Sequence, residues 1–223
     1  MVHVYRIYPK RRKNIFGNFS VNTNIIFINL ICFVAFSFLI TYDVKFLDYI
    51  ALKPLNILGG KYLWTFLTSM FMHAGFFHIF ANMFSLFFIG SLVQKILGQR
   101  RYLYFYLICG LLAGIFFVLS GFFFQDNLNT YAVGASGALF GLVGFLVIIT
   151  PNLPVFIMFI PIPIKMKYAG PGILIVLWLI SKMGNVPIGN MAPLGGLICG
   201  LVYGIYLTRK YRNKTRMIKK YFS

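Results

Sequence analysis

Six runs of mostly apolar residues account for nearly half of the chain and are separated by polar or glycine- and proline-rich segments. A helix of ~20 apolar residues is long enough to cross the ~30 Å hydrocarbon core of a bilayer. Backbone polar groups at that depth must be satisfied within the segment, which favours α-helices. The pattern therefore predicts an all-α integral membrane protein, a bundle of six transmembrane helices over residues 25–42, 78–97, 102–124, 135–149, 168–180 and 192–207.

Two connections differ from simple polar loops. The later part of the long segment 43–77 is apolar and aromatic, so we expect it to lie in the outer interface or dip into it, buried in protein. The apolar segment 155–163 is interrupted by Pro161 and Pro163, and we expect an interfacial or re-entrant connection. The chain then divides into a cytoplasmic basic N-terminal segment (1–24), a six-helix membrane domain (25–207) and a cytoplasmic basic tail (208–223).

The charge distribution predicts the orientation of these helices. The chain is 60% hydrophobic and carries a net charge of +18. Most of the 21 basic residues precede the first run, follow the sixth, or lie in alternate connections, whereas Asp43, Asp48 and Asp126 lie in the others. By the positive-inside rule we expect a multi-pass protein, of the cell membrane, with both termini cytoplasmic. Anionic lipids are the expected partners of the basic termini. Because topology explains the charge, we expect no nucleic-acid binding.

Glycines recur every four residues on three of the runs. The sets are Gly110 and Gly114, then Gly137 and Gly141, and finally Gly196, Gly200 and Gly204. Small residues at this spacing form a strip that another helix can approach closely. The third, fourth and sixth helices are therefore predicted to touch.

Four polar side chains lie where the second and fourth helices begin. His78 and Asn82 are four residues apart on one helical face, His73 lies in the preceding loop, and Ser136 opens the fourth helix. Alone, Ser136 would be interpreted as a small packing residue. Polar groups are costly inside a membrane, however, and several at a shared depth indicate a functional site.

Metal binding is the first chemistry to consider for such a cluster. His73 and His78 provide two ligands, fewer than the three or four of a zinc site, and no acid or cysteine lies near them. Cys32, Cys109 and Cys199 fall inside separate apolar runs, so they indicate small hydrophobic residues and not a disulfide or zinc framework. We expect neither a metal nor a cofactor.

Two motifs in this order resemble those of the rhomboid family of intramembrane serine proteases. His73-x4-His78-x3-Asn82 is similar to the family's motif on its second helix, and Gly134-Ala135-Ser136-Gly137 is similar to its Gly-x-Ser-Gly. The resemblance covers nearly the whole chain, including six helices and the long first external loop. It implies a six-helix rhomboid bundle that cleaves transmembrane segments of membrane proteins.

The resemblance also implies roles for individual residues. Ser136 would be the nucleophile, and its backbone N–H would bind the oxyanion together with the His78 and Asn82 side chains. His73, Gly134, Gly137 and Gly196 would support the site. In the family a histidine in Ala-His-x-Gly-Gly on the sixth helix is the base, but this chain has Ala192-Pro193-Leu194-Gly195-Gly196, with Pro193 at the position of the base.

The missing base leaves the activity open. A serine hydroxyl is a weak nucleophile without a group that accepts its proton. One hypothesis is a serine endopeptidase in which His73, His78 or Lys182 substitutes for the base. The alternative is a catalytically inactive pseudoprotease that binds transmembrane helices without cutting them. A transporter is a weaker hypothesis, since no acid lies within any predicted helix to carry ions.

Overall fold

The structure is a computed structural model that describes residues 19–124, 128–157, 162–183 and 191–222, without the side chains of 180–182. All six predicted apolar helices are present in the described residues. They are α1 (Val21–Tyr42), a second helix from α5 (Phe76–Ser85) through the π-helical turn η3 (Leu86–Gly90) to α6 (Ser91–Leu97), then α7 (Gln99–Phe123), α8 (Ser136–Ile149), α9 (Met166–Met183) and α10 (Met191–Lys210). Another helix, α11 (Arg212–Tyr221), follows α10 in the basic C-terminal segment.

Within the described residues, four helical segments are long and apolar enough to cross a membrane: Val21–Tyr42, Phe76–Leu97, Gln99–Phe123 and Met191–Lys210. Ser136–Ile149 and Met166–Leu179 are shorter apolar helices. The prediction of an all-α integral membrane bundle is confirmed, and most helix ends lie within four residues of the predicted ones.

The two unusual connections contain short elements. The loop after α1 forms α2 (Phe46–Ile50), α3 (Pro54–Leu58), α4 (Thr65–Thr68) and the 3₁₀ turn η2 (Ser69–Phe71). Between α8 and α9, β1 (Pro154–Val155) pairs antiparallel with β2 (Ile164–Lys165). Residues 158–161 of this predicted interfacial connection lie outside the described residues, so its depth in the membrane stays a prediction.

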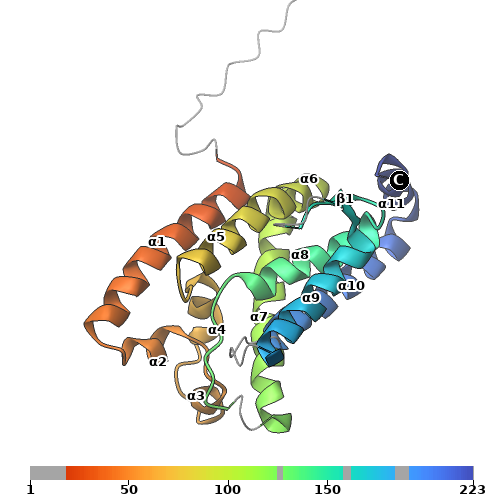
Figure 1. Ribbon diagram of the computed structural model, residues 1–223. Coiled ribbons are helices and arrows are strands. Elements are labelled where there is room, and N and C mark those ends of the chain that lie inside the picture. Colours follow the sequence, from red (N-terminus) through yellow and green to blue (C-terminus); the bar gives the residue numbers. More distant parts are fainter. Residues whose placement is uncertain (1–18, 125–127, 158–161, 184–190, 223) are drawn as a thin grey trace, which may run out of the picture.

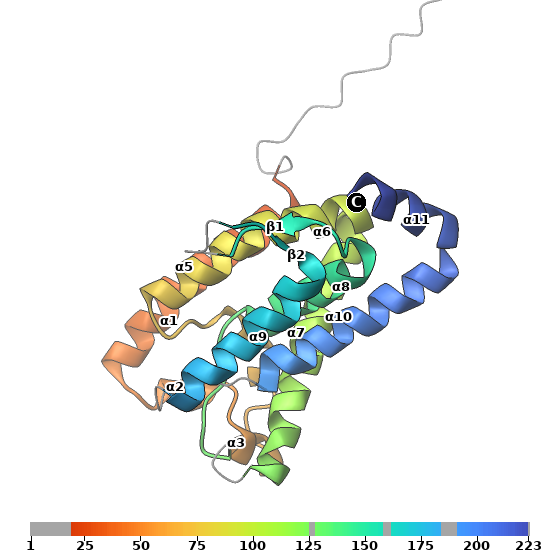
Figure 2. The same cartoon turned by 45° about the vertical axis from the view of Figure 1, so that its right-hand side comes forward.

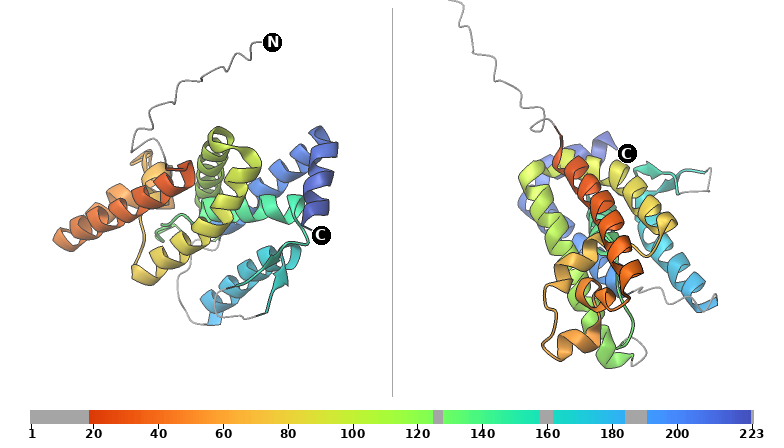
Figure 3. Two further views of the ribbon diagram at one scale, coloured as in Figure 1. Left: turned by 90° about the horizontal axis from the view of Figure 1, so that it is seen from above. Right: turned by 90° about the vertical axis from the view of Figure 1, so that its left-hand side faces the viewer.

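Helix α8 lies at the centre of the bundle, with α5 to α7 on one side and α9 and α10 on the other (Figure 1). Nearly every residue from Gly137 to Leu146 is buried. Figure 2 shows α9 and α10 in front of α8, and each of them packs against α8. Figure 3 shows α1 and α10 on opposite sides of the bundle. A helix that is apolar on all sides suits either a protein core or the lipid, and the burial of α8 shows that it occupies the core.

Glycines bring the backbones of α8 and α10 into direct contact. A Cβ added at Gly196 would collide with the carbonyl oxygen of Gly137, and one added at Gly200 would collide with that of Gly141. A Cβ at Gly144 would collide with the carbonyl oxygen of Leu197. Larger residues at these positions would therefore push the two helices apart.

The predicted contact among α7, α8 and α10 is confirmed, but α7 contributes a different face from the one expected. The Cβ of Ala113 and the Cys109 side chain, not Gly110 and Gly114, lie against the glycines of α8. Gly110 instead accommodates Met70 of the loop, which would collide with any Cβ there. The α7 glycines thus leave room for the loop to pack closely against α7.

A buried polar network holds α1 against the second and third helices. Asn22 Nδ2 donates to the carbonyl of Leu86 (2.9 Å), and Tyr102 Oη donates to Asn22 Oδ1 (2.5 Å). The Asn22 backbone N–H donates to Gln94 Oε1 (2.7 Å). Gly90 leaves the space for these groups, since a Cβ there would lie 2.7 Å from Tyr102 Oη. Leu86 opens the π-helical turn η3, so the network meets the bundle where the helix is irregular.

We expect Gly200→Ala to destabilise the protein by about 1–3 kcal/mol, because the new methyl group would overpack the α8–α10 contact. The control is Gly172→Ala on α9, where an added Cβ meets no atom within 4 Å. Alanine replacing glycine in an open helix position stabilises by roughly 0.5–1 kcal/mol. Thermal unfolding of both variants in detergent measures the difference. Equal melting temperatures would contradict the close contact.

Candidate active site

The segment that leads into α8 is fixed by its backbone. Leu52 and Ala132 form an isolated antiparallel bridge, with N–H to carbonyl distances of 3.1 and 2.8 Å. The Gly134 N–H donates to the carbonyl of Ser69 (2.8 Å). Gly134 has φ +109°, a conformation that side chains disfavour. The loop between α1 and α5 thus positions the start of α8.

Side-chain hydrogen bonds also hold this segment in place. Asp48 Oδ1 accepts hydrogen bonds from Tyr131 Oη (2.7 Å) and Asn56 Nδ2 (2.9 Å), and Lys53 Nζ lies 3.9 Å away. Partial burial opposes ionisation, but these hydrogen bonds hold the pKa of the Asp48 carboxyl below its usual value. Burial, with the carboxylate as a second cause, raises the pKa of Tyr131 to about 12. Asp48 therefore stays charged and Tyr131 stays protonated near neutral pH.

His73 and His78 lie together beside this segment, with ring centroids 5.1 Å apart and rings inclined at 66°. His73 Nε2 accepts the backbone N–H of Ala135 at 3.4 Å, so Nδ1 carries the proton of the neutral ring. That Nδ1 is buried and has no hydrogen-bond partner among the described residues. His73 is thus placed as a support for the first turn of α8.

The hydrogen-bond donors of His78 and Asn82 lie beside Gly134. His78 Nδ1 accepts the Ala74 N–H at 3.5 Å, which leaves the proton on Nε2. A Cβ built on Gly134 would lie 2.8 Å from His78 Nε2 and 3.6 Å from Asn82 Nδ2. Asn82 Nδ2 also donates to the carbonyl of His78 at 3.0 Å, which orients the amide. Both donors therefore face the backbone two residues before Ser136.

Ser136 is the first residue of α8 and is half-buried. Its hydroxyl makes no hydrogen bond with any of the described residues. The 14 residues of α8 span about 21 Å, less than the ~30 Å hydrocarbon core. A helix of this length does not reach from one side of that core to the other. The positive end of its dipole lies at Ser136 and suits a developing anion there.

Pro193 is buried in the first turn of α10, next to the start of α8. A Cβ built on Gly137 would lie 3.9 Å from the carbonyl oxygen of Ala192, and the Gly137 carbonyl contacts Gly196. Proline has no group that accepts or donates a proton in its side chain. The side chain at this position of α10 is therefore a buried apolar ring.

The predicted site residues come together from three helices and one loop. His78 and Asn82 lie beside Gly134, and His73 contacts the ring of His78 and the N–H of Ala135. Gly137 and Gly196 set the distance between α8 and α10. Neither histidine makes a hydrogen bond with Ser136. Lys182 lies in the last turn of α9, but its side chain is outside the described residues. Across the described ranges, no three histidine, cysteine or acidic side chains are grouped as metal ligands would be.

The brace formed by Asp48, Tyr131 and the Leu52–Ala132 bridge was not predicted from the sequence. Its residues are about 80 positions apart along the chain, and no local pattern links them. The one available signal was the scarcity of acids, since Asp48 is one of only three in the chain. A rare carboxylate in an aromatic loop is a candidate for a structural role.

Comparison with known proteins agrees with this geometry. A family model described as the Rhomboid domain matches residues 60–210. RHOMBOID-like protein 1 of Arabidopsis thaliana is 34% identical over 151 residues, covering 66% of this chain and 35% of that protein. RHOMBOID-like protein 2 is 46% identical over 79 residues (35% and 23%), and Inactive RHOMBOID-like protein 8 is 37% identical over 82 residues (37% and 22%), both from the same plant. The chain thus spans less than half the length of each of these relatives.

The environment of His73 predicts a specific pH dependence of stability. Burial, and then repulsion from His78, lowers the pKa of His73 from 6.5 to about 4. Because the folded-state pKa is the lower one, the stability contributed by neutral His73 is complete above pH 6.5 and is lost as the pH falls toward 4. The difference corresponds to roughly 3 kcal/mol.

His73→Gln keeps an acceptor for the Ala135 N–H but does not titrate. We expect this variant to lose less thermal stability than the wild-type protein as the pH falls from about 6.5 toward about 4.5, measured as Tm in detergent. Parallel curves for the two proteins would show that His73 is not buried as a neutral ring.

Proposed function

The chain belongs to the rhomboid family, and we propose that its site binds transmembrane segments of other membrane proteins and holds them against Ser136. Ser136 is the nucleophile of a serine endopeptidase site whose general base is missing. Such a site retains substrate binding and oxyanion stabilisation but turns over very slowly. Both termini are cytoplasmic in this proposal, so the starts of α5, α8 and α10 lie on the outer side.

The observation that carries the proposal is the cluster of donors around the entry to α8. His78 Nε2 and Asn82 Nδ2 are held beside Gly134 by their own hydrogen bonds, and the N–H groups of the first α8 turn have no partner within that helix. Donors fixed before the reaction stabilise an oxyanion without reorganising. A peptide carbonyl placed over Ser136 would meet these groups.

Pro193 supports the second half of the proposal. In soluble serine proteases, loss of the base costs about 10⁶-fold in turnover, because nothing removes the proton from the hydroxyl. The Ser136 hydroxyl is unpartnered among the described residues, and the residue of α10 at the position of the family's base is Pro193, which is buried. A relative named Inactive RHOMBOID-like protein 8 is consistent with binding without cleavage.

The rival candidate is a fully active endopeptidase. It is favoured by the intact donor cluster, which a pure scaffold would not need. It requires a substitute base within hydrogen-bond reach of Ser136. The two candidates therefore differ in one measurable property, the reactivity of the wild-type serine.

We expect Pro193→His to create or greatly increase hydrolysis, because an imidazole would enter the first turn of α10 beside Ser136. The assay combines a serine-directed fluorophosphonate probe with cleavage of a transmembrane substrate by the purified protein. Wild type should show no labelling above Ser136→Ala, and Pro193→His should label and cleave. Ser136→Ala/Pro193→His should do neither.

Pro193→Ala controls for loss of the proline itself, and Tm and binding of the transmembrane substrate confirm that each variant is folded. Wild-type labelling and cleavage equal to those of Pro193→His would establish a substitute base and favour the active enzyme. A folded Pro193→His variant that binds the substrate but neither labels nor cleaves would contradict the assignment of Ser136.

In the Pro193→His background, we expect Asn82→Ala to reduce kcat by about 10²–10³-fold, the usual effect of removing one oxyanion donor. Asn29→Ala is the matched control, since Asn29 is a buried asparagine that also donates to the carbonyl four residues earlier (2.8 Å), but on α1. Equal loss of kcat in both variants would indicate a general packing effect.

A further inference from the structure

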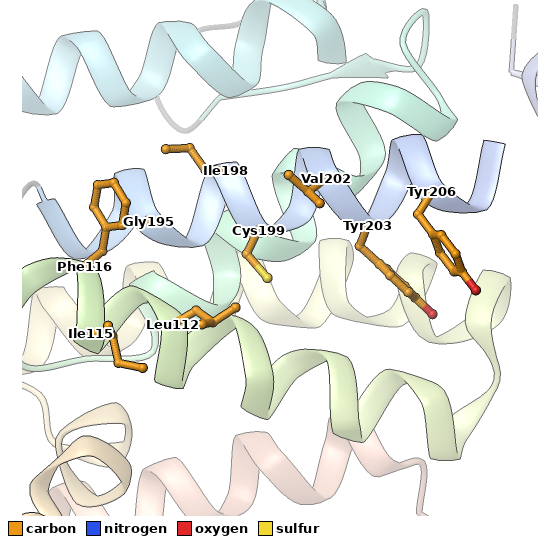
Figure 4. A pocket seen from close by; sticks show the side chains of 9 residues that line it. All are labelled: Leu112, Ile115, Phe116, Gly195, Ile198, Cys199, Val202, Tyr203 and Tyr206. Atoms are coloured by element: carbon orange, nitrogen blue, oxygen red, sulfur yellow. The ribbon is translucent and has the colours of Figure 1, made fainter. Parts of the chain in front are cut away.

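An apolar groove runs between α7 and α10 on the outside of the bundle, and one of its ends lies near the start of α10. Its volume is about 510 Å³. Figure 4 shows the residues that line it, with Phe116 and Gly195 at one end and Tyr203 and Tyr206 at the other. The two helices meet at the first end, because a Cβ on Gly195 would collide with Phe116.

The length of the groove indicates the size of its occupant. Gly195 and Tyr206 are 11 residues apart on α10, which corresponds to about 16 Å along the helix axis. One leaflet contributes about half of the ~30 Å hydrocarbon core. The groove thus matches an acyl chain of a single leaflet, and it is too short for a helix that crosses the membrane.

The second end of the groove is cationic. Lys210 Nζ donates to Tyr206 Oη (2.7 Å) and lies 5.2 Å from the centre of its ring, so the ammonium folds back over the groove. Arg101, in the first turn of α7, lies close enough to interact electrostatically with both Lys210 and Tyr203. The Tyr203 and Tyr206 rings stack with centroids 6.3 Å apart, and both hydroxyls point toward this end (Figure 4).

These polar groups have no acidic counterpart. The one ion pair in the described part of the chain is Lys53–Asp48, in the external loop. The Tyr203 hydroxyl has no hydrogen bond among the described residues either. Two cations and a free hydroxyl at the end of an apolar channel complement a lipid phosphate group.

We propose that the α7–α10 groove binds one anionic glycerophospholipid, with an acyl chain along the apolar channel and the phosphate at Arg101, Lys210 and Tyr203. The site differs from general attraction of lipids to the basic tail, because it needs both the channel and these particular cations. It is independent of the proposed proteolysis.

Native mass spectrometry of the full chain, released from mixed micelles of dioleoyl phosphatidylglycerol and dioleoyl phosphatidylcholine, tests the proposal. We expect the wild type to retain one phosphatidylglycerol in preference to phosphatidylcholine. A cation near a membrane surface strengthens the binding of anionic lipid about fivefold, so Arg101→Gln/Lys210→Gln should weaken retention about 25-fold. The charge-matched control is Lys95→Gln/Arg216→Gln, which removes two exposed cations elsewhere.

A second pair of variants tests the channel. Val202→Trp should fill it and lower retention of phosphatidylglycerol about tenfold or more, whereas Val176→Trp, on the exposed face of α9, should not. Similar losses in the control variants would show a diffuse electrostatic effect and overturn the site. So would equal retention of the two lipids, or full retention in Val202→Trp.

Discussion

The direct contact between the backbones of α8 and α10 is the constraint on which the rest of the structure depends. Gly196 and Gly200 have no room for a side chain, because the carbonyl oxygens of Gly137 and Gly141 occupy that space. In a bilayer, lipid solvates apolar side chains well, so helices associate through close packing more than through hydrophobic burial. This contact encloses α8, a helix of 14 residues, at the centre of the bundle.

Once α8 is fixed, the loop between α1 and α5 determines what surrounds its first turn. The Leu52–Ala132 bridge and the Asp48–Tyr131 hydrogen bond hold the chain before α8, and the positive φ of Gly134 turns it toward His78 and Asn82. In the proposed site, the oxyanion donors come from α5 and the first turn of α8, whereas the position of the base is on α10. A proline at that position is compatible with an intact fold, since proline is well tolerated in the first turn of a helix.

Local patterns in the sequence predicted much of this architecture. Apolar runs predicted the six helices, and glycine spacing predicted that α7, α8 and α10 meet. The motif residues His73, His78, Asn82 and Gly134 do come together. The predicted contact face of α7 was wrong, because glycine spacing does not show which neighbour occupies the space beside each glycine. At Gly110 that neighbour is Met70 of the loop. Non-local pairs such as Asp48 with Tyr131, or Arg101 with Lys210, leave no periodic signal.

The central claim is that Ser136, in the first turn of α8, has no base beside it. The most direct test is the pKa of the thiol introduced by Ser136→Cys, measured as the pH dependence of its alkylation by a water-soluble maleimide, with the modified position located by mass spectrometry. The N-terminus of α8 lowers the pKa of such a thiol by itself, so the midpoint of Ser136→Cys is compared with the midpoints after a further substitution. The account predicts that adding His73→Gln or Lys182→Gln leaves the midpoint unchanged, whereas adding Pro193→His lowers it. A midpoint that rises when His73 or Lys182 is replaced would reveal an activating imidazole or ammonium and contradict the account.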